Sequence, residues 1–267
     1  MIYFVATPIG NLEDITLRAL RVLKESDIIY CEDTRNTKRL LDHYEIKAKL
    51  YSYHKFNEQK RVDEIINLAF NNDISIVSDA GMPGISDPGN ILVRSIIEND
   101  IAYTVLPGAT AFATALVLSG FDNSEFSFLG FLPSKAGDRK KVLENIKKTS
   151  MTQIFYESPH RIFNTLKEIS LIMPNRRIAV IREISKIYED VKIFTASEYK
   201  DVQIIDKGEI VVLLDRFEEE IEITDDFIKM KLEEIRSQGI PNKMAVKQVS
   251  KEYKISKNRV YEISIKI

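Results

Sequence analysis

The sequence predicts an α/β protein of two compact domains with a helical C-terminal extension, and three observations lead to this fold class. Short β-branched runs alternate with amphipathic helical stretches over the first 214 residues. Glycine and proline gather in three loops that each follow a predicted strand. The distribution of charge changes after Leu214. With 267 residues, 44% of them hydrophobic, the chain is long enough to bury two cores.

The first predicted domain covers residues 1–119. Its strands are expected at residues 2–6, 28–31, 50–53, 74–78 and 103–106, and its helices near 17–24, 37–44, 62–70 and 91–97. Strands that alternate with helices in this way form a mainly parallel sheet with helices on both faces.

The second predicted domain covers residues 120–217 and begins where Gly120 interrupts two apolar runs. Its strands are expected at residues 126–130, 153–156, 178–182, 192–194 and 209–214, with helices at 139–148 and 162–172. Residues 218–267 form the extension, which is recognised by a change in the distribution of charged residues. Residues 215–234 hold nine acidic and three basic side chains, whereas residues 239–267 hold seven basic and two acidic ones. The spacing of Val246, Val249, Val260 and Ile263 predicts two short helices around a tight turn.

Composition narrows the possible functions. Cys31 is the only cysteine, so no intrachain disulfide can form, and no secretory signal or membrane-spanning apolar run is evident. We therefore expect a cytoplasmic protein with no membrane partner. The three histidines lack any zinc-ligand spacing, and no metal is expected. The net charge of −2 means that any nucleic acid would need a local basic patch.

Five of the ten glycines and four of the eight prolines lie in three loops, at residues 7–11, 79–89 and 107–110. Loops at the carboxyl ends of parallel strands converge on the ligand crevice of such a sheet. Glycine allows close backbone approach and proline holds the loop shape, so the loops predict a ligand gripped by main chain. The alternative is three ordinary turns. Neither a GxxxxGK[ST] nor a GxGxxG motif is present, which argues against phosphate-held nucleotides and dinucleotides.

Six segments occur in a recognisable order: VATPIGNLEDITLRAL from Val5, CEDTR from Cys31, SDAGMPGISDPG from Ser78, LPGATAFATAL from Leu106, FLGFLPSK from Phe128 and YESPHRI from Tyr156. Together they resemble the ribosomal RNA small subunit methyltransferase I family, which belongs to the tetrapyrrole methylase class. The resemblance runs from Ile2 to about Leu214, and the tail is similar to the family's C-terminal extension.

This resemblance implies a tetrapyrrole methylase-like fold with a mixed sheet in the second domain and S-adenosylmethionine in the cleft between the domains. It also implies a homodimer that methylates the 2′-hydroxyl of a cytidine in the decoding region of 16S rRNA in the 30S subunit. Tetrapyrrole enzymes usually carry a GxGxG loop after the first strand, whereas this chain has Thr7-Pro8-Ile9-Gly10. A methylase of a tetrapyrrole or other small metabolite remains the alternative. A non-catalytic RNA-binding or assembly factor with the same fold is a further one.

The resemblance also assigns the cofactor-binding residues, which are Pro8, Gly81, Met82, Pro83, Ile85, Ser86, Asp87, Gly108, Ala109, Ala111, Tyr156 and Glu157. Methyl transfer to a hydroxyl needs positioning and benefits from a nearby base or cation. The candidates for this catalytic role are Asp33, Arg35, Lys55 and Asp87, with Asp33 or Asp87 assisting the hydroxyl. The candidates for RNA contact are Arg35, His54, Lys55, Lys135, Arg139 and Arg161.

Each candidate has a plainer alternative. Asp33 could cap the next helix, His54 could be a surface histidine, and the basic run at 135–148 could be a solvated helix face. The basic tail could bind RNA or the partner subunit, or pack on its own domain.

Overall fold

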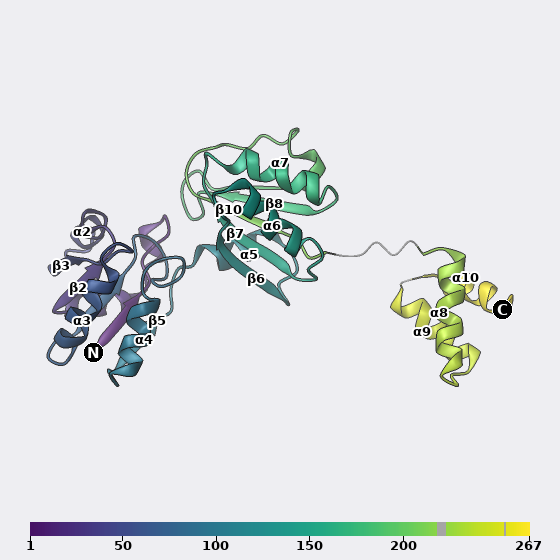
Figure 1. Ribbon diagram of the computed structural model, residues 1–267, viewed down its shortest axis with the longest axis horizontal. Helices are drawn as coiled ribbons and strands as arrows, with labels where there is room; N and C mark the ends of the chain where they lie inside the picture. The colour runs from purple at the N-terminus through teal and green to yellow at the C-terminus, as the bar shows by residue number, and fades with distance from the viewer. Residues whose placement is uncertain (218–222, 254) are drawn as a thin grey trace. The chain divides into compact units, whose positions relative to one another are not determined.

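The computed structural model describes residues 1–217, 223–253 and 255–267, and the chain divides into two compact units, residues 1–217 and 218–267. The first unit contains two lobes, each built on a five-stranded sheet (Figure 1). The second unit is helical.

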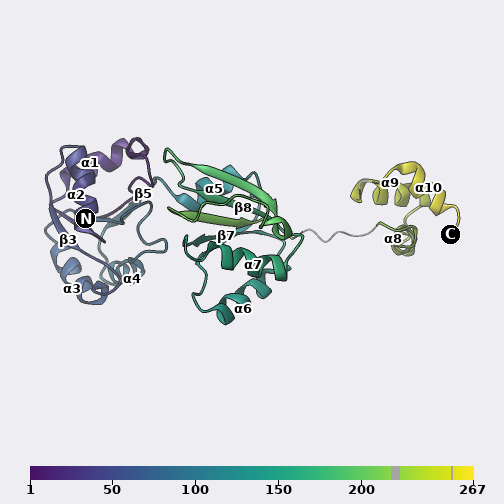
Figure 2. The ribbon, with the colours of Figure 1, turned by 90° about the horizontal axis from the view of Figure 1, so that it is seen from above.

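The sheet of the first lobe is entirely parallel, with strand order β3-β2-β4-β1-β5. Its strands are β1 (Ile2–Val5), β2 (Ile28–Cys31), β3 (Lys49–Ser52), β4 (Ile74–Val77) and β5 (Tyr103–Leu106). The connecting helices are α1 (Leu17–Glu25), α2 (Thr34–His43), α3 (Glu58–Ala69) and α4 (Asn90–Glu98), with a short 3₁₀ turn η1 (Leu12–Asp14). Figure 2 shows α1 and α2 on one side of this sheet and α3 and α4 on the other.

Alternation along each strand explains the two helical layers. Ile2 and Phe4 of β1 pack in the cluster that contains α3 and α4, whereas Val5 packs in the cluster that contains α1 and α2. Because successive side chains of a strand point to opposite faces, a strand buried on both sides must be apolar throughout. The expected parallel sheet is confirmed.

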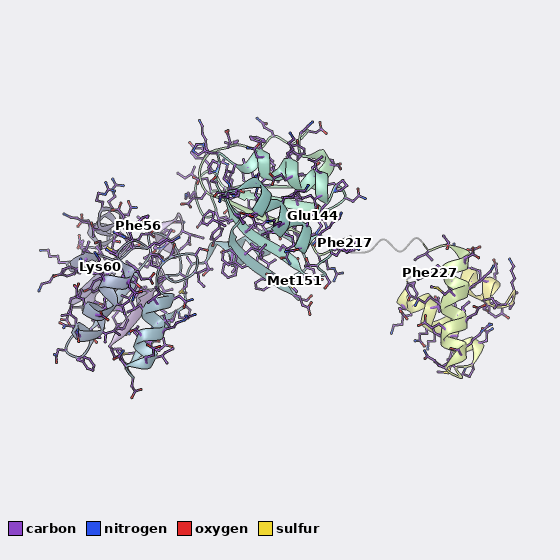
Figure 3. All side chains as sticks on the ribbon, viewed as in Figure 1. Phe56, Lys60, Glu144, Met151, Phe217 and Phe227 are labelled. Atoms are coloured by element: carbon purple, nitrogen blue, oxygen red, sulfur yellow. The ribbon has the colours of Figure 1, made fainter. Side chains whose placement is uncertain are left out.

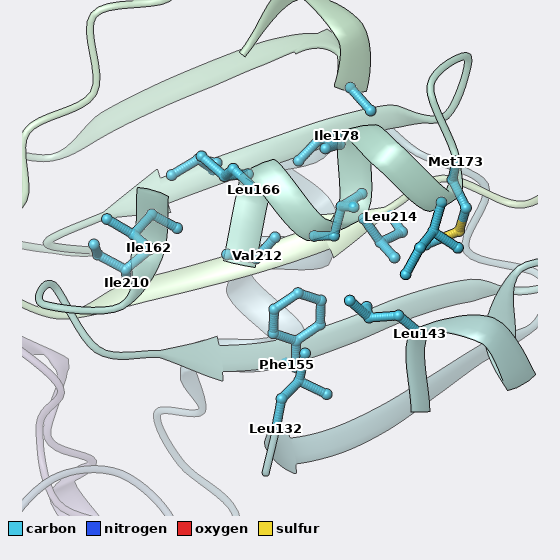
Figure 4. Close-up of a cluster of buried hydrophobic side chains, with 14 of the residues drawn as sticks. Leu132, Leu143, Phe155, Ile162, Leu166, Met173, Ile178, Ile210, Val212 and Leu214 are labelled. Carbon is cyan, nitrogen blue, oxygen red and sulfur yellow. The ribbon is translucent and has the colours of Figure 1, made fainter. Parts of the chain in front are cut away.

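The second lobe holds a mixed sheet with strand order β6-β7-β10-β8-β9. Its strands are β6 (Phe126–Phe131), β7 (Thr152–Glu157), β8 (Arg177–Arg182), β9 (Asp190–Thr195) and β10 (Ile210–Leu214). Only the β6–β7 pair is parallel among these neighbours. Helices α6 (Ala136–Ile146) and α7 (Ile162–Ile172) cover one face, where Leu143 and Leu166 join Phe155 and Val212 in the core (Figure 4). A 3₁₀ turn, η2 (Ala196–Glu198), follows β9.

Helix α5 (Ala111–Ser119) covers the other face of this second sheet, where Ala115 and Leu116 pack with Ile154 and Val211. The sequence division at residue 119 assigned this segment to the first domain, but its packing joins it to the second lobe. No helix was predicted here because the segment is apolar on nearly all sides and lacks a 3.6-residue period.

The second unit consists of α8 (Asp225–Ser237), α9 (Asn242–Glu252) and α10 (Lys257–Ser264) around one small core that includes Leu232 and Val249. The two predicted short helices are α9 and α10, while α8 was not predicted. In the described part of the chain no helix is both long and apolar enough to cross a membrane.

Candidate active site and cofactor pocket

The three glycine-bearing loops follow β4, β1 and β5, which are neighbours in the sheet. The loops are joined by backbone: Thr7 and Gly81 exchange hydrogen bonds of 2.9 and 3.0 Å, and the Thr7 hydroxyl donates to the carbonyl of Ser78 at 3.2 Å. A Cβ at Gly108 would meet the Cβ of Ala6 at 2.6 Å, so only glycine allows the third loop to lie this close to β1. The predicted convergence of the loops is therefore present.

A pocket of about 380 Å³ opens beside these loops and is lined by both lobes. The first lobe contributes Ile9, Ala80, Gly81, Met82, Ile85, Ser86 and Asp87. Helix α5 and the second lobe contribute Thr110, Ala111, Phe131, Tyr156, Glu157, Ser158, Pro159, Gly208, Glu209, Ile210 and Val211.

Eight of the twelve residues predicted to bind the cofactor line this pocket: Gly81, Met82, Ile85, Ser86, Asp87, Ala111, Tyr156 and Glu157. The other four, Pro8, Pro83, Gly108 and Ala109, lie outside the lining. Pro8 and Pro83 are buried, and the carbonyl of Ala109 lies 3.5 Å from where a Cβ of Gly81 would be. Pro8 and Pro83 therefore pack inside the loops, whereas Gly108 is exposed.

The prediction missed the wall formed by Gly208 and the start of β10. The rule for parallel sheets points only to residues at the carboxyl ends of strands, but β10 runs antiparallel to β7, with Ile210 opposite Glu157 and Val211 opposite Tyr156. The amino end of β10 therefore lies beside the carboxyl end of β7. The sequence feature that could have indicated this wall is Gly208, which directly precedes the strand predicted at 209–214.

Asp87 lines the pocket and interacts electrostatically with two other carboxylates of the first lobe, Glu32 and Asp79. Burial raises the pKa of Asp87 to about 6, and the negative charges of Glu32 and Asp79 add to the shift, while the Ser78 hydroxyl opposes it. Burial and the charge of Asp79 also raise the pKa of Glu32, and His54 opposes that shift. Asp87 is thus a carboxylate whose pKa is close to neutral and which faces the pocket.

Asp33 differs from Asp87 both in its hydrogen bonds and in the direction of its pKa shift. Its side chain caps α2 by accepting from the N–H of Arg35 at 2.8 Å, and it pairs with the Arg35 guanidinium at 2.6 Å. These bonds lower the pKa of Asp33 to about 2. Asp33 is therefore an N-cap of α2, which was the plainer of the two roles expected for it. Asp79 accepts from the Asp33 N–H at 2.9 Å and so ties the start of α2 to the second glycine loop.

Glu157 and Arg161 are engaged with each other. The buried Glu157 carboxylate accepts from the Ser158 N–H at 2.8 Å, from the Thr165 hydroxyl at 2.6 Å and from Arg161 at 3.2 Å. Arg161 also donates to the carbonyl of Leu132 at 2.9 Å. Both side chains thereby hold the loop that follows β7.

Arg139, expected to contact RNA, is 5% exposed and forms two 2.7 Å bonds with the Glu168 carboxylate. It also donates to the carbonyls of Pro133 and Ser134. The guanidinium thus ties α6 to α7 and to the 133–134 loop, and faces the interior. Lys135, the residue that precedes α6, is exposed.

The remaining candidates lie on the edge that continues from the glycine loops, since β2 and β3 extend the same parallel sheet. Arg35 and Lys55 are exposed, and His54 is half-buried. Within the described residues, His54 Nδ1 is buried and has no hydrogen-bond partner. Phe56, which was not predicted as a site residue and is labelled in Figure 3, is 94% exposed, and its ring centroid lies 6.0 Å from that of His54.

The pocket suits a cationic ligand that has both apolar and polar parts. The buried side chains of Ile9, Ile210 and Val211 offer an apolar wall, while the carboxylate of Asp87 matches positive charge on a sulfonium or ammonium group. Glu209 also lines the pocket, but its carboxylate pairs with Lys186 at 3.2 Å. Gly81 has a positive φ of 78°, and a Cβ there would meet the Ile9 side chain at 3.2 Å, so glycine suits this part of the pocket wall. In the described part of the chain, no three metal-binding side chains come together.

Comparison with known families assigns a class to this two-lobed α/β unit, whose pocket lies beside loops of a parallel sheet. The profile of the family Tetrapyrrole (Corrin/Porphyrin) Methylases matches residues 1–200, and the chain belongs to this family. Its cofactor is S-adenosylmethionine, as the sequence predicted.

Within this family the chain groups with proteins named ribosomal RNA small subunit methyltransferase I. It is 42% identical to the one from Halalkalibacterium halodurans over 98% of this chain and 93% of the relative. The identity is 40% to the Bacillus subtilis protein, with the same coverage of both chains. It is 39% to the Haemophilus influenzae protein, over 99% of this chain and 96% of the relative.

Solved structures share the fold. Uroporphyrin-III-C-methyltransferase from Thermus thermophilus superposes with a TM-score of 0.58 at 15% identity, over 80% of this chain and 93% of that one. Diphthine synthase superposes with a TM-score of 0.62 at 14% identity, over 80% and 89%. At these identities the likeness concerns the fold alone.

Proposed function

We propose that this protein transfers a methyl group from S-adenosylmethionine to the 2′-hydroxyl of a cytidine in the decoding region of 16S rRNA. It would act on the small ribosomal subunit in the cytoplasm, as a homodimer. The names of the near-full-length relatives support ribosomal RNA as the substrate. The observation that carries the chemistry is Asp87, a pocket-lining carboxylate with a pKa near 6.

S-adenosylmethionine, when bound, supplies an electrophilic methyl group on a sulfonium. The loop residues Gly81, Met82 and Ile85 would hold the cofactor together with Ala111 and Tyr156. The protein's largest contribution is then to hold the ribose hydroxyl in line with the methyl group.

Asp87 is the better of the two candidate bases. A ribose hydroxyl is a weak acid and reacts faster when a neighbouring group accepts its proton. Asp87 would accept this proton on its carboxylate, since it lines the pocket and its raised pKa makes it the stronger base. Asp33 is a weak base with a pKa of about 2, and its carboxylate is committed to α2.

Exposed cations after β2 and β3 of the first lobe and before α6 of the second would bind phosphates and stabilise the developing charge on the oxygen. Arg35, Lys55 and Lys135 are exposed and suit this role, with His54 beside Lys55. Arg35 pairs with Asp33 but is still 84% exposed, unlike Arg139 and Arg161. Arg139 and Arg161 are taken up by Glu168 and Glu157, and we leave them out of the proposed RNA-binding set.

The test is transfer of a tritiated methyl group from S-adenosylmethionine to 30S subunits from a strain that lacks this enzyme, followed by nuclease digestion and mass spectrometry of the labelled nucleoside. Labelled 2′-O-methylcytidine is the expected product. An unlabelled 30S subunit and unlabelled 16S rRNA, with calorimetry showing that the cofactor binds, would refute the proposal.

The second candidate is methylation of a tetrapyrrole or other small metabolite, which the family description favours. The Thr7-Pro8-Ile9-Gly10 loop, in place of GxGxG, argues against it. Incubation with uroporphyrinogen III and labelled cofactor distinguishes the two functions, because a labelled tetrapyrrole is expected only under the second. Light scattering tests the proposed dimer, which should have twice the mass of the chain.

A further inference from the structure

We propose that Phe131 is the residue on which the base of the target nucleotide stacks, and that this contact positions the ribose at the pocket. The proposal rests on the RNA methylation proposed above and adds to it a substrate-positioning residue. Phe131 lies at the end of β6, the edge strand of the second sheet.

A bulge in β6 determines where Phe131 points. Phe126 pairs with Thr152 and Phe128 with Ile154, but the next pair is Phe131 with Tyr156. Between these last two pairs the chain advances three residues along β6 but only two along β7. The extra residue is accommodated at Gly130, whose φ of 63° lies in the left-handed region.

The bulge reverses the face on which Phe131 lies. In a regular strand, residues 126, 128 and 130 would share one face, and Phe131 would lie on the opposite face. With the extra residue, Phe126, Phe128 and Phe131 share one face. The Phe131 ring then packs edge-on against Tyr156, with 5.5 Å between ring centroids.

This position puts Phe131 in the pocket wall and also at its rim. Ile9, Ile210 and Val211 of the wall are buried, with exposed fractions of 8%, 3% and 4%. Phe131 is 59% exposed, more than Ile85 of the second glycine loop at 39%. A cofactor held in the buried part would leave the exposed ring free to meet the substrate. Ser86 of the second glycine loop lies next to the bulge, since a Cβ at Gly130 would stand 3.4 Å from its hydroxyl.

The chemistry of the substrate fits this placement. The base and the 2′-hydroxyl of a nucleotide are attached to adjacent ribose carbons, so a hydroxyl brought to the pocket brings its base to the rim. RNA-binding proteins commonly hold an unstacked base on an exposed aromatic ring. A phenyl ring cannot donate or accept a conventional hydrogen bond, so Phe131 positions a base but does not by itself identify it.

The test compares Phe131→Leu with Phe131→Trp in the full chain. The leucine variant should lower kcat/KM for 30S subunits by about tenfold or more, and should weaken 30S binding in a filter assay, because stacking is lost. The tryptophan variant should restore both. The affinity for S-adenosylmethionine in calorimetry and the mass in light scattering should match those of the wild type. Phe126→Leu is the matched control, since Phe126 lies on the same strand face, is 44% exposed and does not line the pocket.

Three outcomes would overturn the role of Phe131. If Phe131→Leu leaves 30S binding and kcat/KM unchanged, Phe131 does not position the substrate. If the variant loses affinity for the cofactor, Phe131 contacts the cofactor instead of the base. A change in mass would make it an interface between copies of the chain. If instead the wild-type enzyme labels no 16S rRNA, the proposed function fails, and the wild-type control separates that result from the other three.

Discussion

The carboxylate of Glu58, at the start of α3, accepts a hydrogen bond from the backbone N–H of Gly89 at 2.8 Å and another from the Tyr53 hydroxyl at 2.8 Å. Gly89 ends the second glycine loop, and its φ of 147° is a conformation that favours glycine. Glu58 thus fixes one end of the loop that lines the pocket.

Replacing Glu58 by alanine should therefore weaken cofactor binding as well as stability. The buried N–H of Gly89 loses its acceptor, and we expect a loss of about 2 kcal/mol in the free energy of unfolding. Calorimetry should show a weaker affinity for S-adenosylmethionine. Glu64→Ala is the matched control, because Glu64 on the same helix also accepts from a tyrosine, Tyr30 at 2.9 Å, but does not contact the loop. Equal cofactor affinities in the two variants would contradict this role for Glu58.

Asp87 should give the reaction its dependence on pH. The carboxylate accepts a proton only when ionised, so kcat/KM should rise with pH and level off above about 6. Asp87→Asn should lower the rate by about 10²-fold or more and remove this inflection. Asp33→Asn should keep it, because the pKa of Asp33 is about 2. A wild-type profile in Asp87→Asn, measured in single-turnover methylation, would assign the base elsewhere.

The same carboxylate should also affect stability. The folded-state pKa of Asp87 lies above its ordinary value, so the stability that it contributes is complete below the ordinary pKa and is lost as the pH rises through about 6. Asp87→Asn should therefore raise Tm at pH 8 and change it little at pH 4. Thermal unfolding at the two pH values measures this difference.

Gly208 should not tolerate a side chain. Its φ is 80°, and a Cβ would overlap the carboxylate of Glu183, which bonds the Glu209 N–H at 2.9 Å and Lys186 at 2.8 Å. Gly208→Ala should cost about 1–3 kcal/mol in stability and weaken cofactor binding, because Gly208 and Glu209 line the pocket. Gly137→Ala in α6 is the control, since a Cβ there meets nothing within 4 Å and alanine favours helix. Similar denaturation midpoints for both variants would show that the pocket wall can relax.

Alanine variants of Arg139 and Lys135 should show that the first residue has a structural role and the second an RNA-binding role. Arg139→Ala leaves Glu168 without its partner and should cost about 3 kcal/mol in stability. Lys135→Ala should leave the unfolding curve unchanged and weaken 30S binding most at low salt, as expected for a phosphate contact. If Lys135→Ala binds 30S subunits as the wild type does at every salt concentration, Lys135 belongs to a solvated helix face.

The C-terminal unit offers a further basic surface. Lys243, Lys247 and Lys251 follow one another at intervals of four on α9, so they share a helix face, and all three are exposed. Within the described residues none of them forms an ion pair. Replacing the three by alanine should weaken 30S binding and reduce the slope of log K against log salt by up to about 2.7.

The matched control for these lysines lies in the same unit. Lys229 and Lys231 on α8 pair with Asp226 at 3.3 Å and Glu234 at 2.7 Å, and their removal should leave the salt slope unchanged. Equal slopes for the two sets of variants would favour the reading in which the tail is only a packed helical appendage.

Local sequence was sufficient for much of this architecture. The ten strands and the three glycine-bearing loops were predicted from β-branched runs and from glycine and proline positions, because these signals act over a few neighbouring residues. The convergence of the loops followed from one rule about parallel sheets. Eight of the expected cofactor residues therefore line the pocket.

Contacts between distant segments decided the rest. The pKa of Asp33 is lowered by Arg35, only two positions along the chain, whereas the pKa of Asp87 is raised by burial and by Glu32, which is distant in the sequence. Arg139 is a basic residue in a basic run, but Glu168, 29 positions away, takes it into the interior. The direction of β10 and the bulge at Gly130 likewise depend on pairing partners. Burial, charge environment and strand direction are properties of the assembled chain, and a linear pattern of residue types does not encode them locally.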